Sequence, residues 1–375
     1  MRPTELERTG SSRRDFLKSA GVLIVGFSMA GKARKLAGQT QPVVDGAQVD
    51  SWIAIAADES ITAYSGKCEF GQGFQTVQVQ LIADELYVPL ERIRLIFCDT
   101  AQTPDQGVTS GSQSHPAEFG PSGLRQALDT ARDALLQMAS QQLNVPTSQL
   151  TVQDGVISVK TDPAQSVSYG QLVKGRKFNL TLNSKAVPKD PSQYTVLGTS
   201  LPRIDLPAKV TGEFEYVQNV RRPGMLHGKV VRPPVVGATV VSVDRSSVAG
   251  LPGNVQVVVK KDFVGVVADK EWQAIQAALV LNVTWSAGAV LPSQATLYDT
   301  MRKQPSRDSY TVNTPDVDAS LKQAARVLSA TYVHPFQMHG SLASSCAVAD
   351  VQANGATIWP LLSTPARMSL TCAGP

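Results

Sequence analysis

Short stretches in which apolar and polar residues alternate begin soon after residue 50. The alternation predicts two strands, 52–56 and 61–64, joined by a polar turn. A third strand is predicted at 93–97, and Asp154-Gly155 predicts a tight hairpin. The arms of that hairpin are expected at 150–153 and 156–159.

Apolar residues at helical spacing predict two helices in the same part of the chain. The first follows Gly71-Gln72-Gly73 and carries Leu81 on its apolar face. The second covers about 122–143. Its apolar stripe comprises Leu124, Leu128, Ala131, Leu135 and Met138. Strands and helices mixed in this way predict a domain of mixed α and β structure.

The pattern changes near 187–194, a polar run with two prolines that predicts a linker. Beyond it a second compact α/β unit is predicted, with a helix at 271–279. Its strands are expected at 225–231, 255–259, 263–268 and 281–285. Residues 291–318 are again polar and are expected to be irregular. Strands at 325–332 and 345–351 are expected to begin a third element.

The N-terminal residues have the features of an export signal. From Ser12 to Lys18 the chain contains paired arginines followed by Phe, Leu and Lys, and a modest apolar stretch comes next. This order predicts a twin-arginine signal, with residues 1–45 as leader and linker. The alternative is a basic, solvated N-terminal helix. Twin-arginine export carries folded proteins, so we expect a periplasmic location, with or without membrane association, and a cofactor acquired in the cytoplasm.

The net charge and the spacing of the cysteines and histidines exclude some classes of function. The net charge is +4, and much of the excess lies in the leader, so nucleic-acid binding is not indicated. The four cysteines and four histidines lack the close spacings that bind iron–sulfur clusters or zinc, and no protein metal ligand is predicted. Buried thiols are favoured over disulfides, because the cysteines are widely separated. The cysteines are Cys68, Cys98, Cys346 and Cys372.

The sequence Gly71-Gln72-Gly73 is the stretch most suggestive of a ligand. Glycines let the backbone approach a ligand closely, and a glutamine amide both donates and accepts hydrogen bonds. The helix that follows presents backbone N–H groups, which suit an anion. The alternative is an ordinary tight turn into a helix.

Several sequences together resemble one known family. They are 66–76 with 83–86, 109–112 with the helix that contains Arg125 and Arg132, 198–212 and 334–341. In order, they resemble the molybdopterin-binding catalytic subunits of the xanthine dehydrogenase and aldehyde oxidase superfamily, and most closely its exported branch typified by isoquinoline 1-oxidoreductase. The resemblance implies an α+β fold with three parts. These are a molybdopterin-binding α/β domain at 46–192, an α/β hammerhead domain at 193–290, and the start of a second molybdopterin-binding domain at 291–375.

The resemblance also implies which residues line the molybdopterin. They are Gly71, Gln72, Gly73, Phe74, Thr76, Ser110, Gly111 and Ser112. Gln72 would meet an oxo ligand or a pterin edge, unless it is an ordinary surface residue. Phe74 would lie beside the metal or only pack the helix, and Thr76 and Ser112 would bind a phosphate or cap a helix. The cofactor's own sulfurs hold the metal, so none of these residues is a metal ligand.

By the same resemblance, the protein is a subunit of a molybdenum hydroxylase that oxidises an aldehyde or an N-heterocycle with oxygen from water. Molybdopterin, with its cytosine dinucleotide form as one option, carries the metal. Electrons would leave through a small [2Fe-2S] subunit, with a cytochrome c as a further partner. The segment that carries the family's catalytic glutamate is not found, so the catalytic residues are unassigned and the chain is expected to be truncated and inactive alone. The alternative is a non-catalytic periplasmic remnant that binds a partner and no cofactor.

Overall fold

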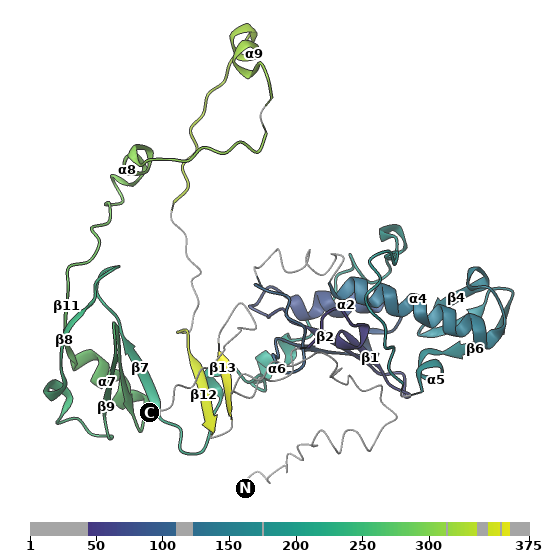
Figure 1. Ribbon diagram of the computed structural model, residues 1–375, viewed down its shortest axis with the longest axis horizontal. Coiled ribbons are helices and arrows are strands. Elements are labelled where there is room, and N and C mark those ends of the chain that lie inside the picture. Colours follow the sequence, from purple (N-terminus) through teal and green to yellow (C-terminus); the bar gives the residue numbers. More distant parts are fainter. Residues whose placement is uncertain are drawn as a thin grey trace, which may run out of the picture. The chain divides into compact units, whose positions relative to one another are not determined.

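The computed structural model describes residues 44–109, 123–174, 176–312, 314–335, 344–352 and 355–360 (Figure 1). Contacts divide the chain into two compact units. The first unit comprises the residues up to Val220 and those from Ser345 onward, and the second comprises 221–344. Both units mix helices with small sheets, as the expected α+β class requires.

The first unit contains a three-stranded sheet built on the predicted hairpin. β1 (Ile53–Ile55) pairs antiparallel with β2 (Ile61–Ser65), and β2 pairs parallel with β3 (Ile93–Phe97). A tight turn cannot join parallel strands, and α2 (Phe74–Leu86) lies in the crossover between β2 and β3. The last residues of β2 and β3 are partners in the register, so both strands end at the same edge of the sheet. The loops that follow them therefore begin side by side.

A long helix and a second sheet complete the core of the first unit. α4 (Leu124–Leu143) packs against α2. Its fully buried residues include Leu124, Leu128, Ala131 and Leu135 of the predicted stripe. β4 (Leu150–Gln153), β5 (Val156–Val159) and β6 (Asp162–Ser168) form an antiparallel sheet, and α5 (Tyr169–Val173) follows it. One hydrophobic core connects these elements with the first sheet.

The second unit contains the predicted α/β elements in two small sheets. Its strands are β7 (His227–Val231), β8 (Val240–Asp244), β9 (Gln256–Lys260), β10 (Phe263–Ala268) and β11 (Asn282–Trp285). β10 lies between β7 and β9, and β8 pairs with β11. α7 (Glu271–Val280) packs against β7 and β10. α8 (Leu297–Lys303) lies within the range that the sequence predicted to be irregular, and α9 (Val317–Gln323) begins at its end.

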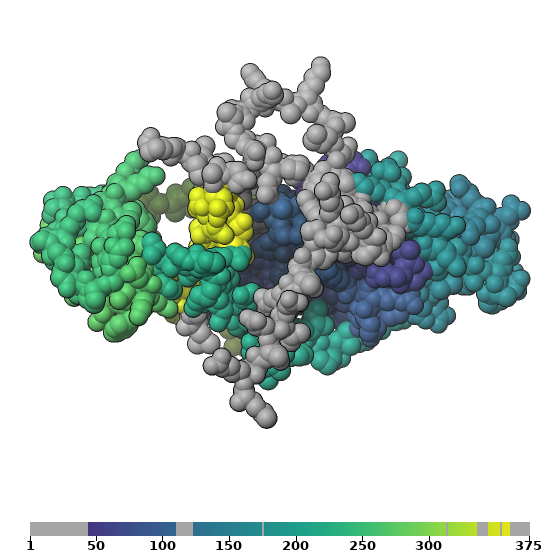
Figure 2. All heavy atoms as spheres, turned by 90° about the horizontal axis from the view of Figure 1, so that it is seen from below, coloured from purple at the N-terminus to yellow at the C-terminus, as the bar shows by residue number. Residues whose placement is uncertain are grey.

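The last described strands belong to the first unit. β12 (Ala347–Gln352) and β13 (Gly355–Pro360) form an antiparallel hairpin. β12 contacts the 3-10 helix η6 (Val217–Asn219), and Figure 2 shows the yellow hairpin against teal residues of the first unit. α6 (Leu206–Thr211) precedes η6. The other 3-10 helices are η1 (Val49–Ser51), η2 (Leu90–Arg92), η4 (Thr147–Gln149), η5 (Pro191–Gln193) and η7 (Arg245–Val248).

Two expectations about the second half of the chain differ from the structure. The strand predicted at 325–332 is wrong, because these residues form no strand and Leu328 and Tyr332 are exposed. The apolar pattern there meets no neighbouring strand within the described ranges, and a strand needs one to pair its backbone groups. The run 187–194 is not a free linker either, since Lys189 is buried and forms an ion pair with Asp84.

Two further observations concern the organisation of the chain. Residues 193–220 group with the first unit, and the domain boundary at 193 stays a prediction. No helix in the described part of the chain has the length and apolar character needed to cross a membrane.

Candidate functional site

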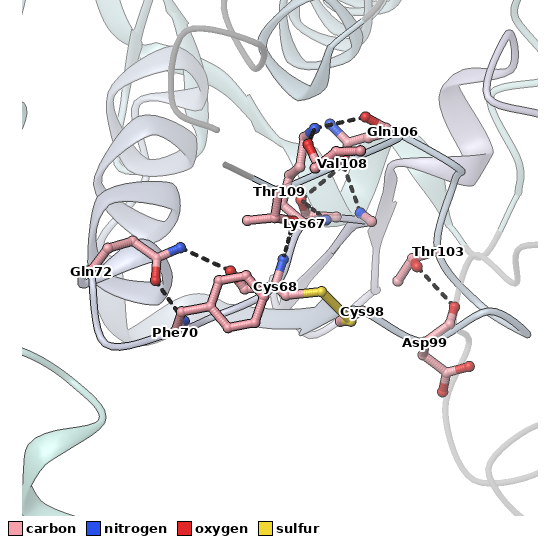
Figure 3. Close-up of a disulfide and its surroundings, with 12 residues drawn as sticks. Lys67, Cys68, Phe70, Gln72, Cys98, Asp99, Thr103, Gln106, Val108 and Thr109 are labelled. Atoms are coloured by element: carbon pink, nitrogen blue, oxygen red, sulfur yellow. Dashed lines mark hydrogen bonds between the residues drawn. A yellow bond between two sulfur atoms is a disulfide. The ribbon is translucent and has the colours of Figure 1, made fainter. Parts of the chain in front are cut away.

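The edge at which β2 and β3 end brings residues 67–68, just before the glycine motif, against residues 106–109. The buried Lys67 donates from Nζ to the carbonyl oxygens of Gln106 (2.7 Å) and Val108 (2.8 Å). The backbone N–H of Cys68 donates to Thr109 Oγ1 over 3.0 Å. The loop after β2 therefore lies directly against the loop after β3 (Figure 3). Ser110, Gly111 and Ser112 follow Thr109 and lie outside the described residues.

A disulfide joins the same two loops. Cys68 and Cys98 are bonded, and their Cα atoms are 5.3 Å apart, a usual separation for this cross-link (Figure 3). The preference for buried thiols was therefore wrong for this pair. Their separation of 30 residues in sequence hides the fact that parallel strands end beside each other. Cys346 is a free thiol, and Cys372 lies outside the described residues.

The two glycines of the motif form an open corner before α2. Gly71 has φ 101° and Gly73 has φ 83°, a conformation that side chains with a Cβ adopt rarely. A Cβ placed on Gly71 would meet no atom within 4 Å, and one on Gly73 would meet only the Arg203 side chain at 3.9 Å. The backbone here is therefore bare and has open space beside it. We call residues 71–73 the glycine corner.

The backbone donors of the glycine corner are bonded to a carboxylate of the protein itself. Glu69 Oε1 accepts from the N–H groups of Gly71 (2.7 Å) and Gly73 (3.1 Å), and Oε2 accepts from Gln75 (3.1 Å). A carboxylate is stabilised there, because the N-terminus of a helix carries partial positive charge. Three of the backbone N–H groups that the sequence suggested for an external anion are thus bonded to Glu69.

The side chain of Gln72 folds back onto its own loop. Its Oε1 accepts from the N–H of Phe70 (2.6 Å) and its Nε2 donates to the carbonyl oxygen of Cys68 (2.9 Å) (Figure 3). A primary amide has four hydrogen-bonding positions in total, and these two bonds use half of them. Gln72 is partly exposed, so a second donor and a second acceptor position are left for a ligand.

Phe74 and Thr76 point away from the open side of the corner. Phe74 is completely buried and packs edge-to-face against Phe97, with ring centroids 6.2 Å apart. Thr76 is buried as well, and its Oγ1 accepts from the N–H of Ile204 over 3.1 Å. These contacts hold α2 against β3 on one side and against the 203–205 segment on the other.

Arg203 is a residue of this site that the sequence analysis did not select. Its Nη1 donates to the carbonyl oxygen of Gly71 (2.7 Å), and its Nη2 lies 3.8 Å from Glu69 Oε1. Asp205 holds the guanidinium with two bonds, of 3.0 Å and 2.6 Å, and this pairing keeps the pKa of Asp205 well below its usual range. In sequence, Arg203 belongs to the 198–212 segment of the family resemblance, but that segment does not reveal a partner 132 residues away.

Behind the corner, a buried ionic cluster fixes the other end of α2. We define this ionic cluster by Asp84, Glu85, Arg125, Asp129, Arg132 and Lys189. Glu85 is fully buried and meets Arg125 Nε at 2.6 Å and Arg132 Nη1 at 2.9 Å. Asp84 meets Lys189 Nζ at 2.9 Å. Among the described residues no group of histidine, cysteine and carboxylate side chains could hold a metal ion.

We expect Gly66→Ala to disturb the site by pushing its two loops apart. A Cβ at Gly66 would lie 2.0 Å from the carbonyl oxygen of Pro104, which is backbone and cannot rotate away. Overpacking of this kind costs about 1–3 kcal/mol of unfolding free energy. Urea unfolding checks this value against Gly46→Ala, whose Cβ would make ordinary contacts of 3.5 Å or more. Equal stability of the two variants would show that the loops yield without cost.

Comparison with known proteins places this site in a family. The family described as the molybdopterin cofactor-binding domain matches residues 6–215, more than half of the chain. The chain therefore belongs to the molybdopterin cofactor-binding domain family, which confirms the resemblance found in the sequence.

Individual relatives are similar over most of this chain. The B subunit of nicotinate dehydrogenase from Pseudomonas putida is 35% identical over 363 residues, which cover 94% of this chain and 30% of the relative. The membrane-bound aldehyde dehydrogenase [pyrroloquinoline-quinone] of Gluconacetobacter polyoxogenes is 28% identical, over 92% of this chain and 46% of the relative. The beta subunit of isoquinoline 1-oxidoreductase from Brevundimonas diminuta is 26% identical, over 76% and 41%. The chain thus spans less than half the length of each of these relatives.

The described residues fit one part of a molybdopterin better than another. Open space beside Gly71 and Gly73 can accept a flat ring edge, and Gln72 retains one donor and one acceptor position. A phosphate would need several backbone N–H groups, and the N–H groups of Gly71, Gly73 and Gln75 are bonded to Glu69. The corner is therefore better suited to the pterin edge than to the phosphate.

Proposed function

We propose that this chain binds molybdopterin at the glycine corner, as part of a molybdenum hydroxylase that oxidises an N-heterocycle or an aldehyde with water as the oxygen source. The observation that carries the proposal is the bare, open backbone at Gly71 and Gly73, which lies within the family match at 6–215. The names of the relatives support the substrate class, since they specify nicotinate, isoquinoline and aldehyde oxidation.

In this proposal each residue of the corner has a separate task. Gly71 and Gly73 let the pterin lie against backbone, and Gln72 orients its edge through the amide. Glu69 keeps the corner in shape, and Arg203 places a positive charge beside it. When bound, the molybdenum cofactor would supply the oxygen-transfer and electron-accepting chemistry. Ser110, Gly111 and Ser112 remain the proposed contacts to the phosphate.

The proposal also covers the form of the cofactor, the partner subunits and the location of the protein. We include the cytosine dinucleotide form of the cofactor, a small [2Fe-2S] subunit and a cytochrome c as electron-transfer partners. The names of two relatives support partner subunits, because both are called subunits. Twin-arginine export to the periplasm is supported by the paired arginines within residues 12–18.

The cofactor content of the purified protein tests the proposal. We expect molybdenum and pterin in equal amounts when the protein is purified from cells that make molybdopterin. Gln72→Ala should lower the bound pterin about tenfold, because hydrogen bonds to the pterin edge are lost. Pterin is measured by fluorescence after oxidation, and molybdenum by mass spectrometry.

Two controls separate cofactor binding from folding. Gln153→Ala changes an exposed glutamine at the end of β4 and should leave the pterin content unchanged. Urea unfolding of both variants shows whether the fold is intact. Pyrroloquinoline quinone in place of pterin, or no cofactor at all, would contradict the proposal, and the second result would favour the non-catalytic alternative.

A further inference from the structure

The disulfide between Cys68 and Cys98 lies next to the proposed cofactor site, because Cys68 bonds the side chain of Gln72. We propose that this cysteine pair is a redox-controlled lock: with free thiols the loop 66–73 can open to admit the cofactor, and oxidation closes the loop over it. The inference rests on the proposed function, because it concerns the same loop. The modification site is the thiol pair of Cys68 and Cys98, which reacts with a disulfide oxidant.

The sheet itself holds the two cysteines in position to react. Cys98 is the first residue after β3, and its N–H donates to the carbonyl oxygen of Ser65, the last residue of β2, over 2.9 Å. Cys68 follows β2 by three residues. Both cysteines are therefore tied to strands that pair with each other along their whole length. The disulfide fits the paired strands, since its Cα atoms are 5.3 Å apart, a usual separation for this cross-link.

Of the two cysteines, Cys98 is the more exposed to solvent. Cys68 has 4% of its surface exposed, whereas Cys98 is partly exposed. Cys98 also has φ 53°, a left-handed conformation that is unfavourable for a residue with a Cβ. Contacts around it must hold that conformation, and the disulfide and the bond to Ser65 are two of them. An external thiol or disulfide would therefore react first at Cys98.

The lock acts on the residue proposed to orient the pterin. The carbonyl oxygen of Cys68 accepts from Gln72 Nε2, so one hydrogen bond separates the disulfide from the cofactor-binding amide (Figure 3). The N–H of Cys68 donates to Thr109, which leads into the second cofactor segment. A covalent bond at Cys68 thus fixes the loop 66–73 to the end of β3. Without it, hydrogen bonds and ion pairs alone hold the loop, and these open and close more readily.

The chemistry is an ordinary thiol–disulfide exchange. The thiolate of Cys98 attacks a disulfide oxidant R–S–S–R, forms a mixed disulfide and releases one R–SH. The thiolate of Cys68 then attacks Cys98 Sγ, which forms the protein disulfide and releases the second R–SH. Two electrons pass from the protein to the oxidant. If the leader directs export, the thiols are reduced where the cofactor is inserted and become oxidised where disulfides persist.

The experiment compares oxidised and reduced protein in a background that lacks the other thiols. Cys346→Ser and Cys372→Ser leave only the pair, which is oxidised with glutathione disulfide or reduced with dithiothreitol and then alkylated. Hydrogen exchange is followed at residues 66–74, and pterin release is followed after dilution. We expect reduction to increase both exchange and release about tenfold, while exchange at β4 and β5 stays unchanged.

Failure of the redox lock can be distinguished from failure of the proposed cofactor binding. Cys68→Ser and Cys98→Ser should match the reduced protein under both conditions, and reduction of the unsubstituted pair gives the same test if a variant folds poorly. Equal exchange at 66–74 in both redox states, or equal pterin release, would overturn the lock. Protein that never contains pterin would contradict the proposed function. If such protein still shows redox-dependent hydrogen exchange at 66–74, the disulfide controls the loop even though the proposed function is wrong.

Discussion

Replacing Glu85 with glutamine is expected to lower the free energy of unfolding of the first unit by about 3–5 kcal/mol. The carboxylate is fully buried and receives Arg125 Nε at 2.6 Å, Arg132 Nη1 at 2.9 Å and the N–H of Lys189 at 3.0 Å. Glutamine keeps the shape but removes the negative charge and turns an amide N–H₂ toward a donor. Two guanidinium groups would then lie in the interior with less compensating charge.

The measurement is urea unfolding at pH 7, followed by circular dichroism. Glu91→Gln is the matched control, because it makes the same substitution at an exposed position of η2. A double-mutant cycle with Arg132→Met isolates the coupling between Glu85 and Arg132. A loss for Glu85→Gln of less than about 1 kcal/mol, the size found for exposed pairs, would show that the ionic cluster is solvated and not buried.

Local elements of the fold could be predicted because their signals lie within a few neighbouring residues. The alternation at 52–64 predicted β1 and β2, and Asp154-Gly155 predicted the turn between β4 and β5. Helical spacing of apolar residues predicted α2 and α4. The strand predicted at 325–332 shows the limit of such signals: its pattern is suitable, yet the described residues offer it no pairing partner.

Contacts within the site could not be predicted in this way, because they join distant parts of the chain. Arg203 bonds the carbonyl oxygen of Gly71 across 132 residues, and Lys189 reaches Asp84 across 105 residues. These pairs depend on how the segment after α5 returns over α2, which no local pattern encodes. The disulfide was missed for the same reason. Only the parallel pairing of β2 with β3 shows that Cys68 and Cys98 are neighbours.

α2 connects the two features on which the proposed function depends. Its N-terminus is bonded to Glu69 next to the glycine corner, and Asp84 and Glu85 near its C-terminus belong to the ionic cluster. Charged contacts therefore fix the helix at both ends. Its position, and with it the position of the corner, should respond to any change in the charge of the cluster.

The stability of the first unit is expected to fall as the pH rises from 5 to 8, and Asp129 is the cause. Burial, a hydrogen bond to Glu85 and the negative charge of Glu85 raise the pKa of Asp129 to about 8, while Arg132 and Arg125 oppose the shift. Neither Asp129 oxygen accepts a hydrogen bond, and Arg132 Nη1 is 3.4 Å away. The buried carboxyl is therefore expected to keep its proton, with the Glu85 carboxylate as the neighbouring acceptor.

The direction of the pH effect follows from comparing the folded and unfolded states. An unfolded aspartate has a pKa of about 3.9, so between pH 5 and 8 the folded protein binds one proton that the unfolded chain has lost. The folded state is therefore stabilised less at each higher pH, by about 1 kcal/mol per pH unit, and this contribution is gone once the pH exceeds the folded pKa.

Urea unfolding at pH 5, 6, 7 and 8 tests the prediction. Asp129→Asn has no proton to exchange at this position, and its stability should change much less over the same range. Asp318→Asn, at an exposed position on α9, is the control and should follow the unsubstituted protein. All three proteins share every other titratable group, so the result is the difference between their slopes of stability against pH. Parallel slopes for the unsubstituted protein and Asp129→Asn would mean that Asp129 is ionised in the folded state, and that the cluster holds two buried carboxylates side by side.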